Sequence, residues 1–79
     1  MKEENYIAAT KEAMSKAYVP YSNYPVGALI VTDNGNTYSG CNVENASYPL
    51  GNCAEASAIA SMVIGGEKKI KTIYVMTKN

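Results

Sequence analysis

The sequence predicts a small α/β domain with the element order helix–strand–strand–helix–strand. Two stretches of helical periodicity, near residues 3–18 and 53–64, alternate with strand-like runs at residues 26–32, 37–43 and 70–76. The chain has 79 residues, 47% of them hydrophobic and 18% charged, which is a globular composition with room for one domain, residues 1–79. Because a helix joins the second and third strands, we expect at least one pair of parallel strands.

The first helix is predicted over residues 3–18. Ile7 and Tyr18 fall near one face of this segment, and the lysines lie mostly off that face. Pro20 ends the helix, because the residue before a proline is pushed out of helical geometry. The tyrosine- and proline-rich run Tyr21–Pro25 is therefore predicted to be a loop.

The next two strands are predicted to form a hairpin. Residues 26–32 are an apolar run bounded by turn residues, which indicates a buried strand. Residues 33–36 carry asparagine and glycine, which tolerate the positive φ angles of a tight turn. Residues 37–43 then return as the second strand.

The second helix is predicted from Cys53 to Ile64, and the pair Gly65–Gly66 ends it. Its outer stripe is small and uncharged, so we expect the helix to be largely buried against a sheet or another chain. Residues 70–76 form the third strand.

The charge balance bears on possible partners. The chain has seven lysines, no arginine and seven acidic residues, for a net charge of zero and a pI near 6.1. Nucleic acids and anionic membranes need a basic face, so we expect neither as a partner. No export signal or membrane-spanning run is present, and two cysteines are too few for a disulfide scaffold, so we expect a cytoplasmic protein with free thiols.

The run Cys53-Ala54-Glu55 at the start of the second helix is a candidate for chemistry. The helix dipole favours a thiolate there, a thiolate can bind zinc, and a carboxylate two residues on could handle the protons of a metal-bound water. The alternative is structural: Asn52 and Glu55 form a capping box, and Cys53 is a small buried hydrophobe. Taken alone, the three residues favour the structural interpretation.

A second candidate lies at the end of the second strand. Side chains alternate along a strand, so Asn42 and Glu44 face one way, and Cys41 and Val43 face the other. An amide beside a carboxylate offers both a donor and acceptors to a sugar hydroxyl. The alternative is a polar strand end that enters a loop. Cys41 has a structural role under either interpretation.

The aromatic residues are all tyrosines, seven in number. Rings in loops can stack on a flat base or fill a subunit interface. Core packing is expected instead for Tyr6, Tyr38 and Tyr74. Those in or beside loops are Tyr18, Tyr21, Tyr24 and Tyr48.

Three separated motifs together resemble the small homotetrameric, zinc-dependent form of cytidine deaminase. They are AYVPYSNYPVGA (residues 17–28), GCNVENASY (residues 40–48) and NCAE (residues 52–55). The resemblance implies a three-layer α/β/α sandwich, here limited to the five elements above. It implies hydrolytic deamination of cytidine or deoxycytidine to the uracil nucleoside, a reaction of pyrimidine salvage.

In that family a zinc ion activates the attacking water, and a glutamate that is not a ligand moves the proton. The resemblance implies that Cys53 is a zinc ligand, that Glu55 is the proton shuttle, and that the backbone of Ala54 touches the pyrimidine edge. Asn42 and Glu44 would hold the ribose, a grip that suits a nucleoside better than a blasticidin-type substrate. Further implied contacts are Tyr24 packed on the base and Tyr48 directed to a neighbouring subunit's site in a homo-oligomer.

The sequence also departs from the family pattern. The family's Pro-Cys-x-x-Cys motif, which follows the third strand and supplies two more Zn²⁺ ligands from a further helix, is absent, and Ala56 replaces the usual arginine. A catalytic zinc ion keeps three protein ligands, so we expect this chain alone to bind zinc poorly. We expect an unpaired edge on the third strand and a second helix without its usual packing partner.

Two functions therefore stay open. One is a cytidine deaminase whose zinc site is completed by further polypeptide. The other is a catalytically inactive, metal-free member of the same fold that binds nucleosides or serves in oligomerisation.

Overall fold

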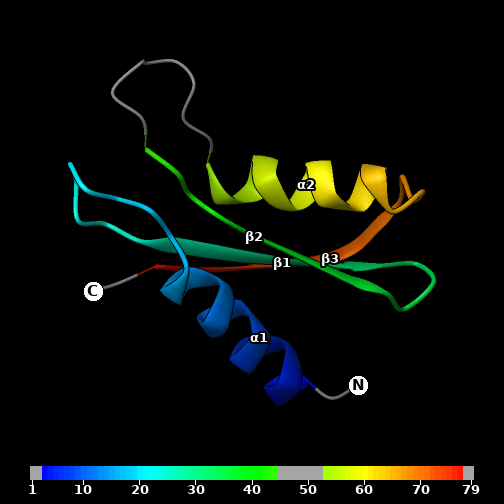
Figure 1. The fold of residues 1–79 in the computed structure, drawn as a ribbon. Helices are drawn as coiled ribbons and strands as arrows, with labels where there is room; N and C mark the ends of the chain where they lie inside the picture. Colours follow the sequence, from blue (N-terminus) through cyan, green and yellow to red (C-terminus); the bar gives the residue numbers. More distant parts are fainter. Residues whose placement is uncertain (1–2, 45–52, 78–79) are drawn as a thin grey trace.

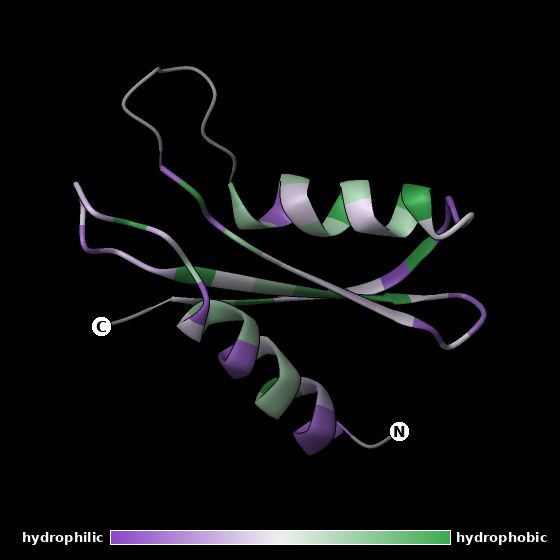
Figure 2. Cartoon of the chain, in the orientation of Figure 1, coloured by the Kyte–Doolittle hydropathy of each residue, from purple (hydrophilic) through white to green (hydrophobic). Residues whose placement is uncertain are grey.

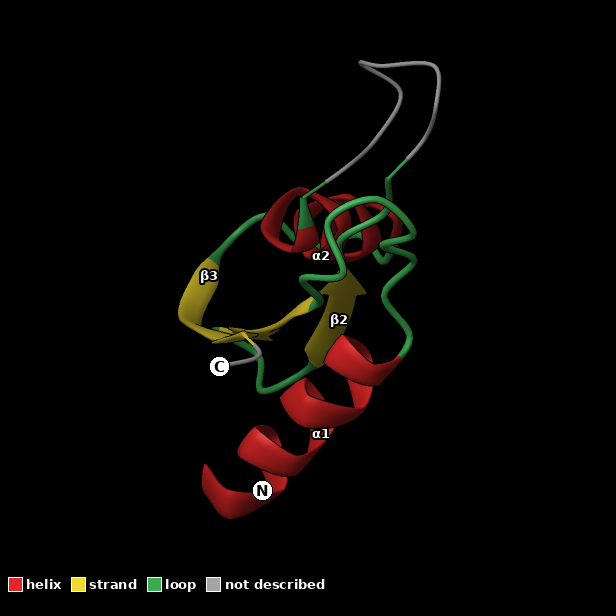
Figure 3. Cartoon of the chain, turned by 90° about the vertical axis from the view of Figure 1, so that its left-hand side faces the viewer, coloured by secondary structure: helices red, strands yellow, loops and turns green. Residues whose placement is uncertain are grey.

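A three-stranded sheet with one helix on each face forms the domain, as Figures 1 and 3 show. The computed structural model describes residues 3–44 and 53–77. The predicted α/β class and element order are confirmed. The elements are α1 (Glu3–Ser15), β1 (Val26–Thr32), β2 (Thr37–Cys41), α2 (Ala54–Ile64) and β3 (Ile70–Thr77).

The central strand of the sheet is β1. The strand order is β2-β1-β3, and β1 runs antiparallel to both neighbours. Six consecutive residues of β1, from Gly27 to Thr32, are buried, as the apolar run predicted. The expected pair of parallel strands is wrong for the described strands. The α2 crossover does make β2 and β3 run in the same direction, but β1 lies between them.

The first helix and the second strand are shorter than predicted. Helix α1 ends at Ser15 instead of Tyr18, and β2 ends at Cys41 instead of Val43. Tyr18 and Val43 form an isolated parallel bridge. The Tyr18 N–H donates to the Asn42 carbonyl at 3.1 Å, so it is not available for another helical turn.

Glycines bring both helices against the sheet backbone. A Cβ atom on Gly27 would lie 2.5 Å from the Thr10 carbonyl oxygen of α1, and one on Gly40 would lie 2.5 Å from the Ala54 carbonyl oxygen of α2. Any side chain at either position would collide with helix backbone. Because the two positions face different helices, α1 and α2 must lie on opposite faces of the sheet.

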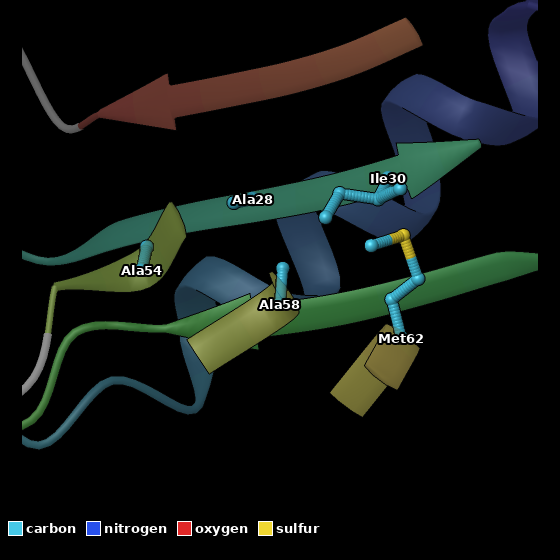
Figure 4. Packing of buried hydrophobic residues seen from close by; sticks show 5 residues of the cluster. All are labelled: Ala28, Ile30, Ala54, Ala58 and Met62. Atoms are coloured by element: carbon cyan, nitrogen blue, oxygen red, sulfur yellow. The ribbon is translucent and has the colours of Figure 1, made fainter. Parts of the chain in front are cut away.

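Small and medium-sized side chains fill the layer between α2 and the sheet (Figure 4). Its buried members are Ala28, Ile30, Ala54, Ala58 and Met62. On the other face, Leu29 and Val31 of β1 are buried on the α1 side.

The tyrosines expected in the core are half-buried. The rings of Tyr6 on α1 and Tyr74 on β3 lie with their centroids 5.6 Å apart. Tyr38 packs against the α2 layer.

Large apolar surfaces remain exposed outside these layers. The sheet buries only one side of α2: Ile59, Val63 and Ile64 are exposed in the single chain, and the last turn is strongly hydrophobic in Figure 2. The reason is that α2 packs over β2 and β1. Burial of this helix against another chain stays a prediction. Strand β3 is an edge strand among the described strands, as expected. None of the helices in residues 3–44 and 53–77 is long and apolar enough to span a membrane.

Candidate functional site

Three segments meet at the end of the molecule where β2 finishes. They are the loop 19–25, the residues 42–44 after β2, and the N-terminus of α2 (Figure 1). Gly40 places the backbone of β2 against Ala54, the first residue of α2. The predicted site residues within the described part of the chain therefore lie on adjoining segments.

The Asn42 side chain links the loop 19–25 to the start of β1 through two hydrogen bonds. Its Oδ1 accepts a hydrogen bond from the Val26 N–H at 2.8 Å, and its Nδ2 donates to the Tyr24 carbonyl at 2.9 Å. An asparagine amide carries the donor and the acceptor that this pair of backbone groups requires. The side chain that was predicted to contact a sugar is thus also a positioning residue for the loop.

The Glu44 carboxylate forms hydrogen bonds with Tyr21 and Ser22 in the first half of the loop. Its Oε1 accepts hydrogen bonds from the N–H groups of Tyr21 at 3.0 Å and Ser22 at 3.1 Å, and its Oε2 accepts one from the Ser22 hydroxyl. The bond from the Ser22 hydroxyl, followed by that from the Ser22 N–H, lowers the pKa of Glu44 from its ordinary value of 4.5. Glu44 is therefore an ionised acceptor at neutral pH.

The loop itself is tightly turned and presents Tyr24 to solvent. The Asn23 N–H donates to the Val19 carbonyl at 3.0 Å, and Asn23 adopts a φ of 56°, a left-handed conformation that asparagine tolerates. The Tyr24 N–H donates to the Ser22 hydroxyl oxygen at 3.1 Å. The Tyr24 side chain is 50% exposed, so its ring is available for contact with a ligand.

Cys53 is the N-cap of α2. Its backbone is extended, its thiol is free and exposed, and its carbonyl accepts the first helical hydrogen bond from the Ser57 N–H at 3.1 Å. The expected capping box is wrong, because the N-cap is Cys53 and not Asn52, so Glu55 stands at the second helical position instead of the third. The expectation of a buried Cys53 is also wrong. Glu55 is half-buried beside it.

The described residues do not complete a metal site. No group of three or more His, Cys, Asp or Glu side chains that could hold a metal ion occurs within residues 3–44 and 53–77. Cys41 pairs in register with Gly27 and so faces α1, whereas Cys53 begins α2 on the other face. The chain has no histidine. One thiolate falls short of the three protein ligands of a catalytic zinc ion.

Tyr48, which the family resemblance directs to a neighbouring subunit's site, lies outside the described residues.

A polar cluster that the sequence did not indicate lies at the opposite end of the molecule. The Glu67 carboxylate accepts hydrogen bonds from Asn34 Nδ2 at 3.0 Å, Asn36 Nδ2 at 2.9 Å and the Tyr38 hydroxyl at 2.9 Å. Hydrogen bonding, with that from Thr32 the largest contribution, lowers the pKa of Glu67 to about 2. The cluster ties the β1–β2 hairpin to the turn after α2, away from the loop 19–25.

Comparison with known proteins agrees with the resemblance. Residues 1–78 match the family model described as the cytidine and deoxycytidylate deaminase zinc-binding region. The chain is 43% identical over 76 residues to the cytidine deaminase of Sporosarcina psychrophila. The matched region covers 96% of this chain and 56% of that protein. It is 47% identical over 68 residues to the cytidine deaminase of Mycoplasma genitalium, covering 84% of this chain and 52% of that protein.

Solved structures give the same result. The crystal structure of cytidine deaminase from Burkholderia pseudomallei matches with a TM-score of 0.91 and 46% identity, over 100% of this chain and 64% of that one. The structure from Mycobacterium tuberculosis matches with a TM-score of 0.88 and 33% identity, over 98% of this chain and 63% of that one. The chain thus spans between half and two thirds of the length of these relatives and corresponds to their N-terminal portion. It belongs to the cytidine and deoxycytidylate deaminase family and has the α/β fold of cytidine deaminases.

Proposed function

We propose that this chain supplies the nucleoside-binding end and the proton-transfer carboxylate of a zinc-dependent deaminase that converts cytidine or deoxycytidine to the uracil nucleoside. One observation carries the proposal. In a fold that matches a cytidine deaminase with a TM-score of 0.91, the exposed Cys53 and the neighbouring Glu55 begin α2 at the end where Asn42, Glu44 and Tyr24 lie. We place the reaction in cytoplasmic pyrimidine salvage.

The proposed binding residues retain capacity for a ligand. The two oxygens of a carboxylate offer about four acceptor positions, so Glu44 can accept a ribose hydroxyl while it holds the loop. The Oδ1 of Asn42 likewise keeps a second lone pair. The exposed ring of Tyr24 offers a flat face to the base. The backbone of Ala54 contacts the pyrimidine edge, and Tyr48 extends to a neighbouring subunit in a homo-oligomer.

The reaction needs a group that moves protons. Hydrolytic deamination replaces the exocyclic amino group of cytosine with oxygen from water and releases ammonia. A carboxylate must take a proton from the water and return one to the departing nitrogen, and Glu55 is the proposed carrier. Cys53 offers one zinc-binding thiolate. Two further ligands are needed, and no group of three potential ligands occurs within residues 3–44 and 53–77, so we propose that other polypeptide supplies them.

The test uses this chain together with a complementary polypeptide, defined as the part of the Burkholderia pseudomallei enzyme that lies C-terminal to the match. The two are co-expressed with zinc, and uridine formation from cytidine is followed by absorbance and chromatography. We expect uridine, and we expect Glu55→Gln to slow its formation by about 10²–10⁴-fold while the zinc content stays unchanged. A zinc-loaded complex that forms no uridine would refute the proposal.

A second candidate function is nucleoside binding without turnover. It is favoured by the lack, within the described residues, of a side-chain group that could hold a metal ion. Under this alternative, cytidine raises the thermal midpoint of the zinc-free chain, and no uridine forms in any combination. Chromatography after overnight incubation separates the two functions.

A further inference from the structure

We propose that Ser22 is a positioning residue that restricts the Glu44 carboxylate to a single sugar hydroxyl. By this restriction it sets how the site discriminates ribonucleosides from deoxyribonucleosides. The inference rests on the proposed function, in which Glu44 contacts the sugar of a nucleoside. The hydrogen bonds that Ser22 forms with Glu44 and Tyr24 are independent of that proposal.

Ser22 contacts both oxygens of the Glu44 carboxylate. Its N–H donates to Oε1 at 3.1 Å, and its hydroxyl donates to Oε2. The same hydroxyl oxygen accepts a hydrogen bond from the Tyr24 N–H at 3.1 Å. A serine hydroxyl has one hydrogen, and here it is directed at Glu44, so Ser22 has none to donate to a ligand. Ser22 therefore acts on a ligand through Glu44 and through the backbone of Tyr24.

The acceptor positions of Glu44 are nearly filled. A carboxylate offers about four such positions, two on each oxygen. The N–H groups of Tyr21 at 3.0 Å and Ser22 at 3.1 Å take both positions on Oε1. The Ser22 hydroxyl takes one of the two on Oε2. Counted over residues 3–44 and 53–77, one acceptor position on Oε2 stays open, which is enough for one hydroxyl of a ligand.

The charge of Glu44 fixes the direction of the bond to the ligand. The Ser22 hydroxyl, and after it the Ser22 N–H, lowers the pKa of Glu44 from its ordinary value of 4.5. An ionised carboxylate accepts hydrogen bonds and donates none. The sugar hydroxyl must therefore be the donor, and it must donate to the same oxygen that the Ser22 hydroxyl contacts.

This arrangement has a consequence for sugar selectivity. A ribonucleoside carries adjacent 2′- and 3′-hydroxyls, whereas a deoxyribonucleoside lacks the 2′-hydroxyl. Two adjacent hydroxyls can both donate to Glu44 only if two acceptor positions are open. With Ser22 in place the second hydroxyl of ribose gains no bond to this carboxylate. Removal of the Ser22 hydroxyl opens a second position on Oε2 and so favours the ribonucleoside.

The experiment measures this selectivity in the zinc-loaded complex of the chain with the complementary polypeptide. Values of kcat and KM are determined for cytidine and for deoxycytidine at pH 7. We expect Ser22→Ala to move the ratio of the two kcat/KM values toward cytidine by at least about fivefold. The change should lie in KM, with kcat within about twofold, because Ser22 acts on the sugar contact and not on the reacting atoms.

Two variants serve as controls. Ser22→Thr keeps the hydroxyl, and its added methyl group lies at an exposed position, so it should restore the selectivity of the unmodified chain. Ser15→Ala removes an equally exposed hydroxyl that donates to the Glu12 carbonyl at 2.6 Å on α1, and it should leave the ratio unchanged. Circular dichroism checks that each variant folds, and Ser22→Gly replaces Ser22→Ala if the latter does not.

A second measurement needs neither zinc nor activity. The carboxyl carbon of Glu44 is titrated by ¹³C NMR in the chain alone. Ser22→Ala should raise the pKa of Glu44 toward 4.5, because the hydroxyl is the largest contribution that lowers it, whereas Ser22→Thr and Ser15→Ala should not.

The outcomes separate this inference from the proposed function. The inference is overturned, and the proposed function stands, if product forms but Ser22→Ala leaves the ratio or the Glu44 pKa unchanged, or if Ser22→Thr behaves as Ser22→Ala does. A zinc-loaded complex that forms no product from either nucleoside refutes the proposed function. The selectivity inferred for Ser22 then falls with it, even where the Glu44 pKa responds as expected.

Discussion

At the scale of single residues, a substitution of Asn42 tests whether its side chain holds the loop 19–25 in place. Asn42→Asp keeps the acceptor for the Val26 N–H but sets a carboxylate oxygen against the Tyr24 carbonyl, which loses its donor. We expect urea unfolding at pH 7 to show a loss of about 1–3 kcal/mol. Asn5→Asp, an exposed change in the first turn of α1, should have little effect. An equal loss in both variants would contradict the assignment.

A substitution of Glu67 tests whether its ionised carboxylate stabilises the fold, because that contribution depends on pH. Its pKa is about 2 in the folded chain against an ordinary value of 4.5, so its stabilising contribution is present above pH 4.5 and is lost as pH falls toward 2. We expect Glu67→Gln to lower the thermal midpoint by a few degrees at pH 7. The difference from the unmodified chain should shrink as pH is lowered from 4.5 to 2.

The control for Glu67 is Glu12→Gln, which removes an equal charge from an exposed position of α1. Circular dichroism melts of the three proteins at pH 7, 4 and 2.5 would decide the matter. A constant difference between Glu67→Gln and the unmodified chain at all three pH values would show that ionisation of this carboxylate is not what stabilises the cluster.

Sequence reasoning found some of these residues and missed others for a physical reason. The pair Asn42 and Glu44 was visible because strand alternation places two polar groups two residues apart. Their bonds to the loop were not, because these join residues 16 to 23 positions away. Glu67 gave no signal at all, since its partners Asn34 and Tyr38 lie 33 and 29 positions away. The roles of Cys53 and Glu55 in chemistry stay predictions.

At the scale of elements, Gly40 tests how α2 is seated. A Cβ atom at this position would collide with the backbone of Ala54 and Ala58. We expect Gly40→Ala to cost about 1–3 kcal/mol in urea unfolding, since a helix backbone cannot move aside as a flexible side chain can. Ser39→Ala, one residue away on an exposed position, should leave stability nearly unchanged. Equal stability of the two variants would show that α2 is not in contact at Gly40.

The elements themselves were largely predictable, but the C-terminal ends of α1 and β2 were not. The apolar run 26–32 specified β1 to the residue, because a buried central strand needs hydrophobic side chains on both faces. The last turn of the first predicted helix was lost to a backbone bridge between Tyr18 and Val43, which no local pattern encodes. Parallel pairing was inferred from the crossover helix alone, and the position of β1 between the two strands overturned it.

At the scale of the whole molecule, large aliphatic side chains of α2 and β3 remain exposed, so the chain alone buries little apolar surface. A chain of this size buries only about 60% of its unfolded surface, so its margin is small. A partner that binds the folded chain alone, at one hundred times its Kd, adds about 2.7 kcal/mol. We therefore expect the thermal midpoint of the chain to rise with the concentration of the complementary polypeptide. A midpoint that stays constant across the titration would contradict a folded-state complex.

The packing beneath α2 is graded along the helix. Near its N-terminus the residues between helix and sheet are small, namely Gly40, Ala28 and Ala54. Toward its C-terminus they are the larger Met62 and Ile30. The smallest side chains of this layer therefore lie near Cys53. A bulkier residue at Gly40 or Ala54 would push the first turn of α2 away from the sheet, whereas shortening Met62 would leave a cavity under the last turns. When Gly40 or Ala54 is enlarged, the expected effect is therefore a loss of the proposed deamination in a chain that still folds.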